Sequence, residues 1–157
     1  MNTLLPDNVF RANVGAVIIN EEGYVLAFER LKIKGAWQFP QGGLNEHEEP
    51  LEAIYREISE ETNISKEKLI LISNYPEWLA YELNNEMRTP KHGRGQVQKW
   101  FLFKFNGNSS DINISDVKEQ EFSAWKWDRM DNIINDTPQF RKQIYIKLKN
   151  YWNIHFA

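Results

Sequence analysis

The chain has 157 residues, with 19 Lys plus Arg against 22 Asp plus Glu, a formal charge of −3, and no cysteine, so disulfides and zinc thiolate sites are excluded. A chain of this length favours one domain over residues 1–157, because such a domain buries roughly 68–70% of its unfolded surface. Aromatic residues make up 13% of the chain, which excludes a disordered protein. The small negative charge argues against a protein that coats nucleic acid non-specifically.

The chain shows no targeting or membrane-spanning segment. Met1 to Phe10 lacks a basic stretch followed by a long apolar core, and apolar runs such as Val17 to Ile19 are much too short to cross a bilayer. We therefore expect a cytoplasmic protein with no membrane partner.

Five short runs rich in β-branched and aromatic residues predict strands. These runs are Val14 to Ile19, Tyr24 to Phe28, Leu69 to Ser73, Gln98 to Phe105 and Phe122 to Trp127. Tyr81 to Gly95 contains several Asn, Pro and Gly residues and is predicted to be a surface loop, where binding groups often reside.

Two segments predict helices. Pro50 suits a first helical turn, apolar residues then recur at spacings of three and four, and Asn63 suits the left-handed end of a helix. This helix is expected over about Pro50 to Thr62. A second is expected from Gln139 to Trp152, where apolar residues repeat every four positions. Strands interspersed with helices indicate an α/β layered domain around a mixed sheet.

The first predicted helix carries an unusual concentration of carboxylates. Glu57, Glu60 and Glu61 share one helical face at about 6 Å, where each like-charged pair costs roughly 3 kcal/mol at an effective dielectric constant of 20. A hard divalent cation such as Mg²⁺, which binds carboxylates and substrate phosphates, would offset this repulsion. The alternative is a solvated face on which Arg56 and Lys66 offset the acids. Upstream, the Gly42–Gly43 turn permits close approach of a ligand or metal.

The segment from Gly42 resembles the Nudix box, Gly-x5-Glu-x7-Arg-Glu-U-x-Glu-Glu-x-Gly-U, where U is aliphatic. Eight of nine fixed positions match over 23 residues: Gly42, Glu48, Arg56, Glu57, Ile58, Glu60, Glu61 and Ile64. Asn63 replaces the motif glycine, and because Asn also tolerates the left-handed conformation, we expect little cost.

The resemblance extends beyond the box to the bacterial RNA pyrophosphohydrolase branch, which is similar to dinucleoside tetraphosphate hydrolases that cleave asymmetrically. The similar segments are Arg11 to Gly15, Trp37 to Gly43, Trp78 to Tyr81, Gly95 to Phe101, Glu121 to Trp127 and Phe140 to Tyr145. Ala12 replaces a proline usual in the family, which leaves Arg11 available. The resemblance implies the Nudix fold, an α/β/α sandwich around a mixed sheet.

The resemblance also implies roles for the catalytic and metal residues. Glu57, Glu60 and Glu61 are expected to hold Mg²⁺, or Mn²⁺ or another divalent cation, with the Gly42 carbonyl as an additional candidate ligand. Arg56 is expected to orient the glutamates. Glu121 matches a family glutamate that contributes to metal binding or deprotonates water; taken without the resemblance, it is an ordinary loop acid.

Six residues are candidates for substrate binding. Arg11 and Arg30 match family positions that contact phosphates and nucleotide, and Arg30 with Phe140 is implied to clamp a base. The alternatives are a solvated strand end for Arg30 and a core position for Phe140, whose stripe continues through Ile144. The remaining candidates are Tyr81, Lys99 and Arg141.

Together these features predict a metal-dependent hydrolase of phosphoanhydride bonds in nucleotide polyphosphates. The favoured substrate is 5′-triphosphorylated RNA, whose conversion to 5′-monophosphate RNA initiates mRNA decay. The alternatives are an asymmetrical dinucleoside tetraphosphate hydrolase and a catalytically silent nucleotide-binding Nudix domain. DNA is not expected as a partner, and the existence of a protein activator is left open.

Overall fold

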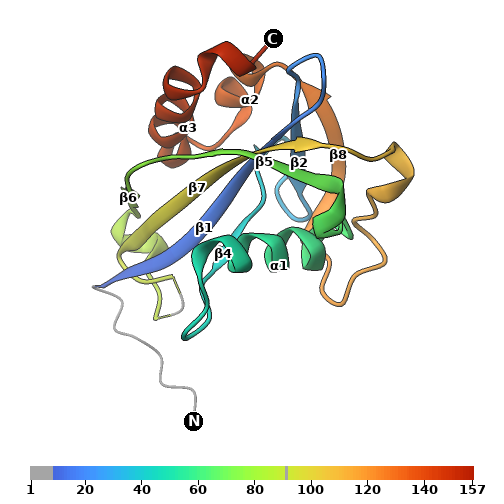
Figure 1. The fold of residues 1–157 in the computed structure, drawn as a ribbon. Coiled ribbons are helices and arrows are strands. Elements are labelled where there is room, and N and C mark those ends of the chain that lie inside the picture. The colour runs from blue at the N-terminus through green and yellow to red at the C-terminus, as the bar shows by residue number, and fades with distance from the viewer. Residues whose placement is uncertain (1–8, 91) are drawn as a thin grey trace.

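A mixed β-sheet lies between two helical layers, with α1 on one face and α2 and α3 on the other (Figure 1). The computed structural model describes residues 9–90 and 92–157, so most of the Met1 to Phe10 segment lies outside the described residues. The helices are α1 (Pro50–Thr62), α2 (Met130–Asp136) and α3 (Gln139–Tyr151). This arrangement confirms the predicted α/β/α sandwich.

Two long strands run side by side at the centre of the sheet. β1 and β7 pair in parallel from Phe10 opposite Gly95 to Ile19 opposite Lys104, and the other strand pairs are antiparallel. The main strand order is β3-β2-β1-β7-β5, while β4, β6 and β8 pair with β1, β7 and β2. The strands are β1 (Phe10–Ile19), β2 (Val25–Arg30), β3 (Trp37–Gln38), β4 (Gln41–Gly43), β5 (Leu69–Asn74), β6 (Leu79–Glu82), β7 (Gly95–Phe105) and β8 (Phe122–Asp128).

Both faces of the sheet are covered, which explains why β1 reads as a continuous apolar run. Val14, Ala16 and Ile18 pack in the core beneath α1, while Val17 and Ile19 pack in the core beneath α2 and α3. Successive side chains of a strand point to opposite faces, so a strand buried on both sides is apolar at every position.

The structure agrees with the predicted helix Pro50 to Thr62 and ends the last helix at Tyr151. The segment Tyr81 to Gly95 is predicted to be a loop, but Tyr81 lies in β6, a four-residue strand that pairs with β7, and Gly95 begins β7 itself. A strand this short depends on its distant partner and leaves little local signal. The short strands β3 and β4 were missed for the same reason, and α2 was missed because its seven residues are too few to show a helical repeat.

None of the helices within residues 9–90 and 92–157 is long and apolar enough to cross a membrane.

Candidate active site

The turn before α1 brings the backbone of β4 against a carboxylate. Gly42 pairs with Val14 of β1, and a Cβ atom added to Gly42 would lie 2.0 Å from the carboxyl carbon of Glu57. Only glycine leaves room for the Glu57 carboxylate at this position. The turn and the helix face therefore form one compact site.

Arg56 connects this turn to three glutamates. Its Nε and Nη2 donate to the two Glu48 carboxylate oxygens at 2.8 and 3.0 Å, and Nη2 also donates to the Gly43 carbonyl at 2.8 Å. Nη1 donates to Glu57 at 2.8 Å and to Glu60 at 3.3 Å. The Arg56 guanidinium lowers the pKa of Glu48. Such forked charge-assisted bonds hold the carboxylates in fixed orientations.

Glu57 and Glu121 lie close enough to Glu61 for their charges to act on it. Burial raises the pKa of Glu57, whose side chain is 14% exposed. Burial also raises the pKa of Glu61 well above its usual value, and the charges of Glu57 and Glu121 add to this effect while Arg30 opposes it. The positive charge of Arg30 therefore offsets the burial of Glu61 only in part.

The donor set fits a hard divalent cation, because such ions bind carboxylate oxygens. Glu61 Oε2 is buried and has no hydrogen-bond partner in the part of the chain that the structure describes. Among the same residues, no three acidic or histidine side chains form a ready-made metal-binding group. Glu60 is 60% exposed and paired with Arg56.

A cavity of about 500 Å³ is lined by aromatic and cationic side chains, among them Arg30, whose charge acts on Glu61. The rings of Tyr81 and Phe140 are 5.3 Å apart, and the Arg141 guanidinium lies 4.7 Å from the Phe140 ring. Phe140 is half-buried at the cavity wall, whereas Ile144 belongs to the core. Flat rings and guanidinium groups of this kind suit a nucleobase and its phosphates.

Arg141 is a buried cation in this wall. Its residue is 8% exposed, it forms no ion pair with any described carboxylate, and its Nε has no hydrogen-bond partner among the described residues. Burial raises the pKa of Tyr81, and the nearby Arg141 charge opposes that change. A buried guanidinium without a carboxylate partner fits an anionic ligand.

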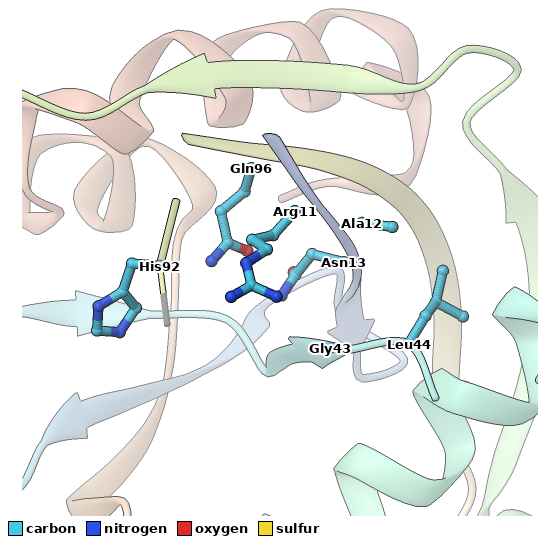
Figure 2. Close-up of a pocket in the computed structure, with 7 residues that line it drawn as sticks. All are labelled: Arg11, Ala12, Asn13, Gly43, Leu44, His92 and Gln96. Carbon is cyan, nitrogen blue, oxygen red and sulfur yellow. The ribbon is translucent and has the colours of Figure 1, made fainter. Parts of the chain in front are cut away.

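A second hollow of about 390 Å³ adjoins the first, and both are lined by Gln96 and His92. Figure 2 shows Arg11, Asn13 and Gln96 gathered together, with Gly43 nearby and His92 on a separate segment. The Arg11 guanidinium donates to the Pro90 carbonyl. The glycine turn therefore has Arg11 on one side and the aromatic cavity on the other.

Lys99 is not brought together with the other predicted substrate residues. Its ammonium donates to the Tyr75 carbonyl at 2.7 Å, and it lines a different hollow, near the start of α1. Gln41 and Asn13, which are not among the predicted site residues, also line the two cavities. Their positions next to predicted site residues could have indicated this, because Gln41 directly precedes Gly42 and Asn13 lies two residues after Arg11.

Comparison with known proteins gives consistent matches. The family model described as the NUDIX domain matches residues 9–148. The chain is 39% identical over 162 residues to an RNA pyrophosphohydrolase of Bartonella henselae, covering 94% of this chain and 91% of the relative. It is 32% identical over 158 residues to the chloroplastic Nudix hydrolase 26 of Arabidopsis thaliana, covering 96% of this chain and 72% of the relative.

Solved structures share the fold at lower sequence identity. A C. elegans Ap4A hydrolase superposes with a TM-score of 0.68 at 23% identity, covering 91% of this chain and 98% of the other. The E. coli dihydroneopterin triphosphate pyrophosphohydrolase superposes with a TM-score of 0.71 at 22% identity, covering 90% of this chain and 97% of the other.

Proposed function

This chain belongs to the Nudix hydrolase family, whose members hydrolyse pyrophosphate bonds, and we propose that it removes pyrophosphate from the triphosphorylated 5′ end of RNA. The product is a 5′-monophosphate RNA that is exposed to decay. We assign residues 1–157 to one domain and Mg²⁺ as the cation, with Mn²⁺ as the alternative.

The observation that carries this proposal is that Arg30 links the aromatic cavity to the carboxylates. Arg30 lines the cavity, and its charge also acts on Glu61. A base stacked on Phe140 gains roughly 1–3 kcal/mol whatever its identity, which suits the end of an RNA chain. Its phosphates then lie within reach of Arg30 and Arg141.

The carboxylates supply the reaction site. Glu57, Glu61 and Glu121, joined by Glu60, would hold the cation, which when bound neutralises polyphosphate charge and acidifies water. Arg56 keeps Glu57 oriented through its 2.8 Å bond. If Glu121 is not a metal ligand, its carboxylate, which forms no ion pair among the described residues, is the candidate that accepts the proton of the attacking water.

An asymmetrical dinucleoside tetraphosphate hydrolase is the second candidate. The adjoining hollow lined by Arg11 and Asn13 offers space for a second nucleoside. A catalytically silent nucleotide-binding domain is less well supported, because a binder has no need for the full set of Glu57, Glu60, Glu61 and Arg56.

The two substrates are distinguished in one assay. Triphosphorylated RNA and dinucleoside tetraphosphate are supplied at equal concentration with Mg²⁺, and rates and products are measured by chromatography. We expect faster turnover of the RNA, with release of pyrophosphate and a 5′ monophosphate. Faster cleavage of the dinucleoside would favour the second candidate, and no metal-dependent release from either would support the silent binder.

A further inference from the structure

Gln98 is a buried amide at the centre of a hydrogen-bond network beneath both cavities. Its residue is 1% exposed, and it lies opposite Asn13 in the parallel pairing of β1 and β7. Gln98 Nε2 donates to Asn13 Oδ1 at 2.8 Å and to Gln41 Oε1 at 3.3 Å. Gln98 Oε1 accepts a bond from Trp100 Nε1 at 3.0 Å.

Trp100 determines which way the Gln98 amide points. An indole N–H can only donate, so the Gln98 atom that faces it must be the oxygen. The Gln98 NH₂ group is then directed at Asn13 and Gln41. Gly15 lies opposite Trp100 in the β1–β7 pairing, and a Cβ at this position would lie 2.6 to 2.7 Å from the indole ring. The missing side chain lets the ring pack against β1.

The orientation of Gln98 sets the orientation of two further amides. Because the carbonyl oxygens of Asn13 and Gln41 both accept from Gln98, their NH₂ groups remain for other partners. Asn13 lines the hollow beside Arg11, and Gln41 lines the cavity beside Arg30. The Gln41 amide also contacts the Tyr81 hydroxyl at the cavity wall.

We propose that Gln98 is a positioning residue that turns the N–H donors of Asn13 and Gln41 toward an anionic nucleotide substrate, on the two sides of the glycine turn. β4 connects these residues to the reaction site, because in its pairing with β1 Gln41 lies opposite Gly15 and Gly43 lies opposite Asn13. If the Gln98 amide were turned around, its NH₂ group would face the indole N–H of Trp100, and two donors would oppose each other. Asn13 and Gln41 would then present oxygen atoms to the phosphates, and like partial charges would repel.

This inference rests on the proposed function only in taking the occupant to be a nucleotide polyphosphate. The test is Gln98→Met, which keeps the length of the side chain and adds no charge. We expect the KM for triphosphorylated RNA to rise about tenfold, the order expected when hydrogen bonds to a charged ligand weaken, with kcat changed by less than about twofold. Gln143→Met, an exposed change on α3, is the matched control and should leave KM unchanged.

A coupling measurement separates positioning from a general structural effect. In a chain that already carries Asn13→Ala and Gln41→Ala, Gln98→Met should raise KM by less than about twofold further, because the residues through which it acts are gone. An unchanged KM in the wild-type background, or an equal rise in both backgrounds, would overturn the proposal. Trp100→Phe, which removes the indole N–H together with part of a buried ring, should shift KM in the same direction, and it replaces Gln98→Met if that variant does not fold, with thermal unfolding measured to confirm that it is folded.

A binding assay keeps this result independent of the RNA proposal. Affinity for a nucleoside triphosphate with a methylene group between its α and β phosphates, the position at which pyrophosphate release breaks the chain, is measured by calorimetry. If the wild type does not hydrolyse RNA but Gln98→Met weakens this binding about tenfold, the proposed function fails and the positioning role stands. If RNA is hydrolysed and binding is unchanged in Gln98→Met, the positioning role fails alone.

Discussion

Identical residue types on one helix face have different roles because their surroundings differ. Glu57 is held by Arg56, Glu60 is exposed, and Glu61 carries a buried oxygen without a partner among the described residues. Repulsion between these carboxylates follows from helical spacing, but the burial of Glu61 follows from its neighbours. The least compensated of the three acids is therefore the strongest candidate for a direct metal ligand.

Glu61→Gln tests this assignment by activity and by stability. Hydrolysis should fall by about 100-fold or more, because an amide is a weaker ligand for a hard cation. Without divalent cations the variant should unfold at a higher temperature than the wild type at pH 7, because the buried charge of Glu61, which is repelled by Glu57 and Glu121, is removed. Burial places the folded-state pKa of Glu61 above its ordinary value of 4.5, so the difference should vanish below about pH 4.5, where both states are protonated. Near wild-type hydrolysis in saturating Mg²⁺ would contradict the metal role.

At the scale of elements, the end of α1 shows how a departure from the family pattern is accommodated. Asn63 has φ of 62°, the left-handed conformation, and its backbone N–H donates to the Ser59 carbonyl. Its side-chain amide donates to the carbonyls of Asn113 and Asp116 at 2.8 and 3.0 Å. Glycine cannot make these bonds, so asparagine ties the helix to the segment that leads to Glu121.

Substitutions at Asn63 should separate backbone strain from these bonds. Asn63→Gly should lower the free energy of unfolding by about 1 kcal/mol, because it loses the side-chain bonds but suits the left-handed conformation. Asn63→Ala should lower it by about 2–3 kcal/mol, because backbone strain is added. Urea denaturation measures both values, and an alanine variant as stable as the glycine variant would show that strain contributes nothing here.

At the scale of the whole molecule, the aromatic cavity joins segments distant in sequence. Arg30 comes from β2, Tyr81 from β6, and Phe140 and Arg141 from the start of α3. Strand pairing across the sheet brings them together, so the cavity exists only in the folded chain.

Phe140→Ala distinguishes a cavity wall from a core position. We expect RNA binding to weaken by roughly 1–3 kcal/mol, the value of one stacked base, with a small change in thermal stability. Leu148→Ala, on the same helix but fully buried in the core, should instead lower stability by about 2–5 kcal/mol and leave binding by the folded protein unchanged. Calorimetric binding and thermal unfolding are measured on both. Lost stability with unchanged binding in Phe140→Ala would assign it to the core.

Local features of this chain were predictable. The bounds of α1, the left-handed Asn63 and the carboxylates on one helix face agree between sequence and structure, because helical contacts join residues three and four apart. The fold followed from alternating strands and helices together with the family resemblance. The metal and substrate assignments remain predictions, now with a geometry that mutations can test.

What the sequence by itself determined about this protein is its two longer helices and its longer strands, its family and its cluster of acids. Only the tertiary structure decided that Tyr81 lies in a strand, that Lys99 lines a different hollow from Phe140, and that Gln98 lies beneath both cavities. The physical reason is that the face and partner of a strand residue depend on register with strands far away in sequence, and a shift of one position reverses every side chain.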